Sequence, residues 1–318
     1  MKLGLIGLGR MGGNIARRLM RGGHSVVVFD QSNDAVSALA KDGAIAASSL
    51  ADLYGKLDKP AIVWVMLPAG QPTEATIDAI AALAKPEDVI IDGGNTFYKD
   101  DIRRAAALEP RGVRYVDVGT SGGVWGLERG YCMMIGGFEA VVNRLDPIFN
   151  TLAPGYGTIP RTAGRTSTDD RAERGYIHAG PAGAGHFVKM IHNGIEYGLM
   201  QAYAEGFSIL KAKKELDIDL EQCANIWQKG SVVRSWLLDL TAEALRKNPE
   251  LEGMEAYVSD SGEGRWTVFE AIDLNVSAPV ITESLIRRLR SREENNFTDR
   301  MLSVMRNEFG GHAIKKSE

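Results

Sequence analysis

The side chains best suited to chemistry are concentrated in residues 185–198, which read Gly-His-Phe-Val-Lys-Met-Ile-His-Asn-Gly-Ile-Glu-Tyr-Gly. At the helical spacing of roughly 100° per residue, five of them fall on one arc: Lys189, His192, Asn193, Glu196 and Tyr197. An amine and a carboxylate on one side of a helix can serve as the base and the acid of a proton transfer. This stretch therefore predicts an active-site helix.

The opposite side of this helix is apolar and contains Phe187, Ile191 and Ile195. We expect the apolar side to pack and the polar side to face a cavity. A surface helix can show the same pattern. Gly194 and Gly198 favour the active-site interpretation, because each glycine costs a helix about 1 kcal/mol and so indicates close packing.

A second group of residues is typical of dinucleotide binding. Gly7, Gly9 and Gly12 form a GxGxxG that follows a predicted strand and opens a predicted helix, so that backbone and helix N-terminus face a pyrophosphate. Asp30 ends the next predicted strand, where its carboxylate can accept hydrogen bonds from ribose hydroxyls and repel a 2'-phosphate. This favours NAD, while Arg10 keeps NADP possible.

The alternative interpretation is that these glycines serve only a turn and that Asp30 caps the next helix.

On the dinucleotide-binding interpretation, we predict nine cofactor-binding positions: Gly7, Leu8, Gly9, Arg10, Met11, Gly12, Asp30, Leu67 and Asn95.

Two glycine-containing loops are expected at the carboxyl ends of neighbouring strands, where open α/β sheets bind ligands. One is Asp92-Gly93-Gly94-Asn95 and the other is Ser121-Gly122-Gly123. Asn95 and Ser121 offer oriented hydrogen bonds, and the glycines let backbone N–H groups approach a carboxylate. Together the loops predict a substrate pocket beside the nicotinamide.

The elements that must position these residues follow an alternating pattern of strands and helices, which is typical of a parallel sheet covered on both faces. We predict strands at 2–6, 25–29, 61–66, 89–92, 114–118 and 132–135, and helices at 13–21, 33–41, 73–83, 99–108 and 139–152. Residues 154–183 are expected to form a connection without a periodic element. The prediction is an α/β, Rossmann-type, doubly wound domain over residues 1–175.

Beyond residue 184 the pattern becomes helical, with helices expected at 184–214, 221–226, 235–247, 266–274 and 280–290. We therefore predict an all-α domain over residues 176–318.

Composition limits the possible partners. The 318 residues carry a net charge of -4, which is not typical of nucleic-acid binding. No apolar run reaches the roughly 20 residues of a membrane span. Cys132 and Cys223 lack metal-ligand spacing, so we expect free thiols, no metal and a cytoplasmic location.

The chain resembles short-form 6-phosphogluconate dehydrogenases. The resemblance is carried by residues 185–198, by the two glycine loops and by a terminal Arg-Asn-Glu-Phe-Gly-Gly-His at 306–312. It implies that Lys189 is the general base for the 3-hydroxyl proton and that Glu196 protonates C1 of the enediol after carbon dioxide leaves. The implied product is ribulose 5-phosphate, in the pentose phosphate pathway.

The resemblance also implies the substrate contacts. Carboxylate and hydroxyls would be held by Asn95, Ser121, Gly122, Gly123, His192 and Asn193; the phosphate would be held by Tyr197, Arg265, Arg288, Arg306 and His312. In the family, the last arginine and histidine reach the site of a neighbouring subunit, so a homo-oligomer is implied. The alternative for Arg288 is that it belongs to a basic cluster that is only solvated surface.

Two other functions stay open. Another β-hydroxyacid dehydrogenase, such as one for 3-hydroxyisobutyrate, shares the nucleotide fold, the Ser-Gly-Gly and the lysine, but needs neither a phosphate cluster nor Glu196. A non-catalytic NAD-binding sensor would have little reason to align Lys189, Asn193 and Glu196.

Overall fold

The computed structural model describes residues 1–157, 163–294, 297–310 and 313–315. The chain divides into two compact units, Met1–Asn193 and Gly194–Glu318. This division falls later than the expected boundary at 175/176, which stays a prediction. The predicted fold class is confirmed: a mainly parallel sheet with helices on both faces, followed by a helical region.

The first unit is built on one sheet with the strand order β3-β2-β1-β4-β5-β6-β7-β8. The strands are β1 Lys2–Ile6, β2 Ser25–Phe29, β3 Ile45–Ala46, β4 Ile62–Val65, β5 Val89–Asp92, β6 Arg114–Ser121, β7 Cys132–Gly137 and β8 Tyr176–Gly180. From β3 to β6 every pairing is parallel. The chain first runs from β1 outwards to β2 and β3 and then returns to β4 on the other side of β1.

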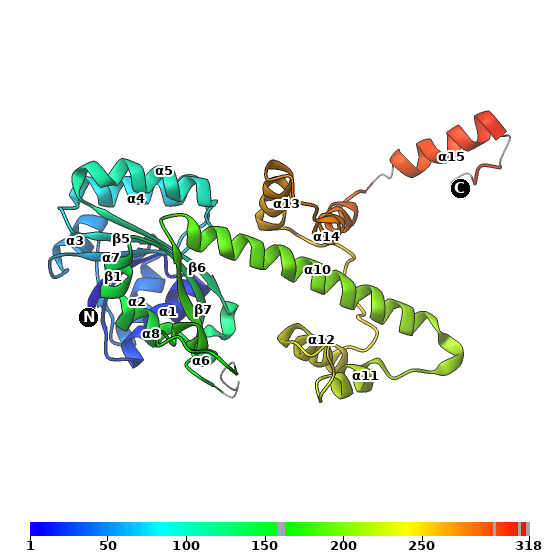
Figure 1. Ribbon diagram of the computed structural model, residues 1–318, viewed down its shortest axis with the longest axis horizontal. Helices are drawn as coiled ribbons and strands as arrows, with labels where there is room; N and C mark the ends of the chain where they lie inside the picture. The colour runs from blue at the N-terminus through cyan, green and yellow to red at the C-terminus, as the bar shows by residue number, and fades with distance from the viewer. Residues whose placement is uncertain (158–162, 295–296, 311–312, 316–318) are drawn as a thin grey trace. The chain divides into compact units, whose positions relative to one another are not determined.

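Helices cover both faces of this sheet (Figure 1). The helices α1 Arg10–Arg21, α2 Asn33–Lys41, α7 Glu139–Arg144 and α8 Asp146–Leu152 pack on one face; α3 Leu50–Gly55, α4 Gln71–Leu83 and α5 Tyr98–Leu108 pack on the other. Alternate residues of a strand point to opposite faces. Leu3 and Leu5 of β1 accordingly belong to the first layer, and Ile6 belongs to the second.

The structure corrects the prediction at the far edge of the sheet. β7 pairs antiparallel with β6, because the connection between them is too short for the crossover that a parallel pair requires. The supposed connection at 154–183 contains α9 Arg171–Arg174 and β8, which pairs with β7.

Two further corrections concern helices and a short strand. The single helix expected at 139–152 is two helices that meet at Leu145, where Pro147 cannot continue the backbone hydrogen bonds. Strand β3 and helix α3 were not predicted, because each is too short to show a periodic pattern.

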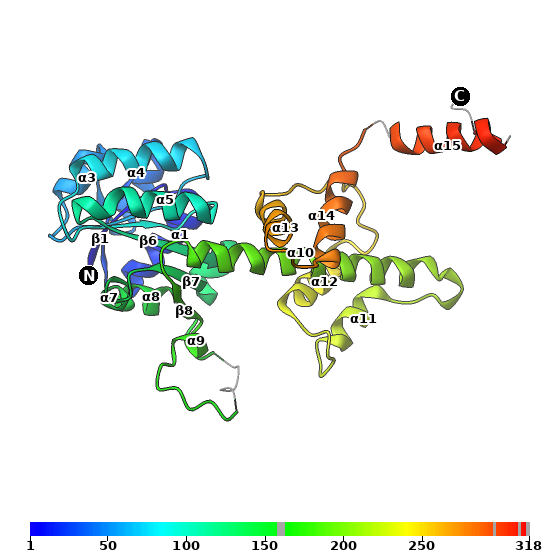
Figure 2. The same cartoon turned by 45° about the horizontal axis from the view of Figure 1, so that its top comes forward.

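The long helix α10 spans Ala184–Ala212 and is followed by α11 Leu220–Trp227, α12 Trp236–Lys247, α13 Glu263–Asp273, α14 Pro279–Arg290 and α15 Phe297–Gly310. In the second unit α11 lies beside α12 and α13 beside α14 (Figure 2). Phe207 of α10 joins Ala224, Leu238, Ala242 and Leu245 in a small core. None of the helices in the described residues is long and apolar enough to cross a membrane.

Candidate active site

The predicted glycine loop joins β1 to α1 in the required geometry. Gly7 has a φ of +90°, and a Cβ there would lie 2.4 Å from the carbonyl oxygen of Met66. A Cβ on Gly12 would lie 1.9 Å from the carbonyl oxygen of Gly7, so only glycine lets α1 start this close to the strand. The contact with Met66 places the loop at the switch point between β1 and β4, where such sheets bind ligands.

Gly9 differs from its two neighbours in the motif. In the described part of the chain, and apart from Gly9 and its two chain neighbours, no atom lies within 4 Å of the position of its Cβ, and its φ of -58° suits any residue. Nothing in the protein therefore requires glycine there, whereas a pyrophosphate approaching the backbone at the N-terminus of α1 would. The loop fits a dinucleotide.

Asp30 is hydrogen-bonded to the glycine loop, whose cofactor it is expected to bind. Its Oδ2 accepts a hydrogen bond from the Leu8 N–H at 2.6 Å, and its Oδ1 accepts one from the Ser32 N–H at 2.8 Å. The cap of α2 is Ser32, whose hydroxyl accepts from the Ala35 N–H. This excludes the alternative in which Asp30 caps that helix. Of the other positions predicted to contact the cofactor, Arg10 is exposed, and Met11 and Leu67 are half-buried.

The loop after β5 is fixed from below by a buried carboxylate. Asp92 accepts hydrogen bonds from the Gly94 N–H at 3.0 Å, from Thr96 at 2.7 Å and from Arg104 at 3.0 Å. Asp92 thus supports the loop, and Asn95 at its tip is exposed. A Cβ on Gly94 would lie 2.6 Å from the Leu67 carbonyl oxygen, so this loop packs beside the one after β4.

Lys189 meets this loop. Its Nζ donates to the Asn95 side-chain oxygen at 3.2 Å, and the residue is 7% exposed. A Cβ on Gly119 would lie 2.4 Å from the Lys189 Cβ, so the glycine in β6 lets α10 and its lysine lie directly on the sheet. The Ser121 loop at the end of the same strand is tied to α1 by the Asn14 amide, which donates to the Val124 carbonyl at 3.2 Å. One connected region of the first unit therefore contains the dinucleotide loop, Asn95, Lys189 and the Ser121 loop.

A buried cluster that sequence reasoning missed anchors the start of α10. Asp117 of β6 accepts from the Gly183 N–H at 2.7 Å and from the His186 N–H at 2.8 Å. The His186 ring is bonded to Asp101 at 2.7 Å. A signal was present in the sequence, since the aspartate between Val116 and Val118 in a predicted strand must find partners when it is buried.

In this cluster the His186 imidazolium and the Asp101 carboxylate stabilise each other's charge. Burial works against the imidazolium of His186, but the Asp101 carboxylate outweighs it and raises the pKa of His186. Burial also raises the pKa of Asp101 and the pKa of Asp117. Although these three side chains bring metal-ligand atoms within 4.8 Å of one another, the contacts already described occupy both carboxylates and the His186 Nδ1. The buried His186 Nε2 has no hydrogen-bond partner among the described residues. We interpret the cluster as an ion-pair network that fixes the helix.

The expected division of α10 into a packed apolar side and an open polar side is wrong. Ile195 is 52% exposed, whereas Lys189 and Tyr197 are buried at 7% and 5%. The polar side packs because glycines of neighbouring elements leave room for it: Gly119 lies against Lys189, and a Cβ on Gly264 would lie 2.5 Å from the Tyr197 ring. Gly194 is in close contact with Thr267, as expected from its place in the sequence. The His192 ring is bonded to the Asn193 side chain at 2.9 Å. Glu196 is half-buried.

Within the second unit, three residues predicted to bind phosphate lie around one segment, 259–261. The Arg288 guanidinium stacks 3.5 Å from the Tyr197 ring centre and donates to the Ser259 carbonyl at 2.9 Å. Arg265 donates to Asp260 through Nε at 3.3 Å and Nη2 at 3.0 Å. Arg288 is therefore not merely part of a solvated basic cluster.

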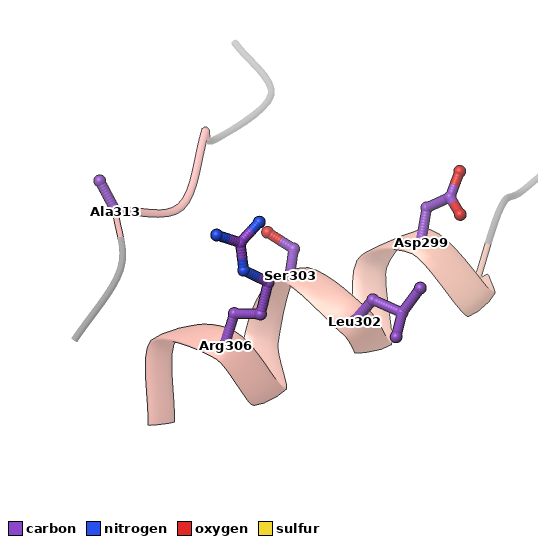
Figure 3. A pocket seen from close by; sticks show the side chains of 5 residues that line it. All are labelled: Asp299, Leu302, Ser303, Arg306 and Ala313. Carbon is purple, nitrogen blue, oxygen red and sulfur yellow. The ribbon is translucent and has the colours of Figure 1, made fainter. Parts of the chain in front are cut away.

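The remaining predicted residues lie at the C-terminus. Arg306 belongs to α15, where it lines a hollow of ≈ 320 Å³ with Asp299, Leu302, Ser303 and Ala313 (Figure 3). Among the described residues that line this hollow, Arg306 alone was predicted to belong to the site, so the hollow by itself does not mark the place of the chemistry. His312 lies outside the described residues.

The fold and the glycine loop define a dinucleotide-binding oxidoreductase. Residues 2–160 match the NAD binding domain of 6-phosphogluconate dehydrogenase, and residues 185–315 match the 6-phosphogluconate dehydrogenase C-terminal domain. The chain belongs to the 6-phosphogluconate dehydrogenase family.

Similar proteins agree with this membership. A Bacillus subtilis protein, YqeC, named as a candidate 6-phosphogluconate dehydrogenase, is 42% identical over 99% of this chain and 100% of its own length. An NAD(+)-dependent, decarboxylating 6-phosphogluconate dehydrogenase of Haloferax volcanii is 40% identical over the full length of both chains. The solved 6-phosphogluconate dehydrogenase of Plasmodium falciparum, described in its apo form, with its cofactor NADP+ and with its substrate, is 26% identical with a TM-score of 0.80 over all of this chain and 67% of that one.

Proposed function

We propose that this protein oxidises and decarboxylates 6-phosphogluconate to ribulose 5-phosphate and carbon dioxide, as a step of the pentose phosphate pathway. The observation that carries the proposal is the buried Lys189, which reaches Asn95 beside the dinucleotide loop. The match of residues 185–315 to the C-terminal domain of this family favours it over a dehydrogenase for 3-hydroxyisobutyrate.

The proposed roles follow from the positions of the side chains. Lys189 removes the proton of the 3-hydroxyl. A nicotinamide cofactor held by the glycine loop would supply the acceptor for the hydride on C3. Glu196 lies seven residues further along α10, which at 3.6 residues per turn returns it to the same side of the helix. There it protonates C1 of the enediol that remains after carbon dioxide has left. Asn95, Ser121, Gly122, Gly123, His192 and Asn193 hold the carboxylate and hydroxyls.

NAD is the proposed cofactor in preference to NADP. Both oxygens of Asp30 already accept backbone N–H groups, which holds its charge at the end of β2. A fixed carboxylate there repels a 2'-phosphate. The comparison of kcat/KM with NAD and with NADP tests this, and a clear NADP preference would overturn the role of Asp30.

We also propose that the active form is a homo-oligomer. The apolar side of α10 is open in the single chain, with Ile195 and Leu199 exposed at 52% and 45%. Helix α15 likewise exposes Phe297 and Leu302. Contiguous exposed apolar surfaces often mark protein–protein interfaces. A second copy would cover them and bring Arg306 and His312 to a neighbouring site.

The decisive experiment supplies 6-phosphogluconate with NAD or NADP and follows absorbance at 340 nm together with released carbon dioxide. We expect reduced cofactor and carbon dioxide in equal amounts. Reduction without carbon dioxide would contradict the decarboxylation, and turnover of 3-hydroxyisobutyrate in place of 6-phosphogluconate would favour the alternative enzyme. A protein that binds NAD and turns over neither substrate would support the sensor interpretation.

A further inference from the structure

The arginines at the end of α14 have different partners. Arg290 pairs with Asp299 and Glu293, and Arg287 is exposed on the surface. Arg288 and Arg292, four residues apart, both contact the segment 259–260. The arginines that form one basic cluster in the sequence therefore have separate environments. Only Arg288 and Arg292 lie beside the residues expected to bind phosphate.

Asp260 joins Arg292 to Arg265. Its carboxylate accepts from Arg292 Nη2 at 2.7 Å and from Arg265 at 3.0 and 3.3 Å, and the Asp260 side chain is only 4% exposed. The two arginine side chains keep 24% and 43% exposure. A buried carboxylate thus holds two guanidinium groups at the surface, beside the third guanidinium, Arg288.

The hydrogen bonds leave these arginines able to bind an anion. A guanidinium carries five N–H donors, and Asp260 uses only some of those of each arginine. The three guanidiniums also outnumber the carboxylates of Asp260 and Glu263 in this segment. Planar guanidiniums bind phosphate oxygens in pairs, which suits a phosphate monoester better than a sugar hydroxyl.

We propose that Arg292 is a further residue that binds the substrate phosphate, and that Asp260 is a positioning residue that holds Arg265 and Arg292 for it. The inference rests on the proposed function and extends it, because the family resemblance points to neither residue. Hydrogen bonds from Arg265 and Arg292, opposed by burial, lower the pKa of Asp260 to about 2, so its negative charge is present at every working pH.

The test is steady-state kinetics with 6-phosphogluconate at saturating NAD. Hydrogen bonds to charged groups are worth about 1.5–3 kcal/mol, so Arg292→Ala should raise the KM for 6-phosphogluconate roughly 10- to 100-fold and leave kcat and the KM for NAD nearly unchanged. Arg292→Lys should recover part of the loss. Arg287→Ala, on the same helix, is the matched control and should resemble wild type.

The Asp260→Asn variant distinguishes two roles of Asp260: positioning the arginines for the substrate phosphate, or competing with that phosphate for them. If Asp260 positions the arginines, the variant raises the KM for 6-phosphogluconate and weakens inhibition by inorganic phosphate. A lowered KM would mean that Asp260 competes with the phosphate, and would overturn its assigned role.

Two results distinguish this inference from the proposed function. A wild-type enzyme that turns over 6-phosphogluconate, with Arg292→Ala matching Arg287→Ala, overturns the inference alone. A wild-type enzyme without turnover overturns both.

Discussion

Lys189 shows how a single residue depends on its surroundings. Its 7% exposure is possible because Gly119 leaves space for its Cβ and the Asn95 side-chain oxygen accepts a hydrogen bond from its Nζ. A buried amine needs such a partner, since an unpaired charge in the interior is costly. The same contact brings the amine to the loop after β5, where the reacting carbon of a substrate would lie beside the cofactor.

At this scale we predict that Lys189→Ala and Glu196→Gln each lower kcat by on the order of 10²–10⁴, the usual contribution of a general acid or base. The dissociation constant for NAD, measured by fluorescence titration, should not change, because neither side chain belongs to the glycine loop. Lys211→Ala and Glu205→Gln are the matched controls: both residues lie on α10 and are exposed, and we expect normal turnover. Near-normal kcat in either active-site variant would refute its assigned role.

Elements position these residues, and the strand-loop-helix at β1 and α1 is the clearest case. Gly7 and Gly12 are required by the protein itself, because a Cβ on either would meet backbone atoms. Gly9 is required only if a ligand occupies the open space beside it. The motif therefore contains two structural glycines and one that reports cofactor binding.

We predict that Gly9→Ala leaves the melting temperature unchanged and raises the KM for NAD at least about tenfold, which corresponds to 1.4 kcal/mol. Gly12→Ala, the comparison variant, should lower the free energy of unfolding by about 1–3 kcal/mol, because its Cβ overpacks the turn. Thermal unfolding followed by circular dichroism, with cofactor kinetics, separates the two. Equal NAD affinity for Gly9→Ala and wild type would exclude a pyrophosphate at this loop.

The packing of α4 against α5 depends on a second set of charges. Glu74 of α4 accepts from Arg103 at 2.7 and 2.8 Å and from Arg104 at 2.8 Å, and Arg104 continues to Asp92 beneath the Asn95 loop. Hydrogen bonds from Arg103, opposed by burial and aided by Arg104, lower the pKa of Glu74 to about 2. The ionised form is thus favoured in the folded state.

A lowered folded-state pKa stabilises the protein above the unfolded value near 4.3, and this contribution is lost as the pH falls toward about 2. We predict that the urea midpoint of Glu74→Gln lies below that of wild type at pH 7 and that the difference shrinks as the pH falls from 5 to 3. Asp78→Asn, an exposed position on the same helix, is the control. A difference that stays constant with pH would show that the ionisation of Glu74 is not responsible.

At the scale of the whole molecule, the chain exposes apolar surfaces that the proposed homo-oligomer would cover. Helix α15 exposes Phe297, Leu302 and Met305 at 69%, 51% and 47%, and it carries Arg306. If Arg306 binds the phosphate of a neighbouring subunit, removing it should affect substrate binding without affecting NAD.

We predict that truncation before Arg306, or Arg306→Ala, sharply raises the KM for 6-phosphogluconate. Mixed oligomers give the stronger test. A chain with Lys189→Ala and a chain with Arg306→Ala, each poorly active alone, should recover activity when refolded together, because one site of the mixed pair then combines an intact Lys189 with an intact Arg306. No recovery would show that Arg306 acts within its own chain or not at all.

Much of this protein could be predicted from sequence because the signals are local. Gly7, Gly9, Gly12 and Asp30 lie next to the strands that orient them, so their spacing alone indicates the dinucleotide loop. The residues from Lys189 to Tyr197 share one helix, whose period places them on a common arc. The parallel sheet with helices on both faces follows from the alternation of apolar segments.

Tertiary structure decided what depends on partners distant in the sequence. The burial of the polar side of α10 and the anchoring of its first turn by Asp117 and Asp101 both require contacts that no local pattern contains. The same is true of the basic residues near the end of α14, where Asp260, 32 residues before Arg292, selects one arginine and leaves Arg287 at the surface. Sequence spacing determines which side chains share an element, whereas the packing between elements determines which of them are buried, paired or open to a ligand.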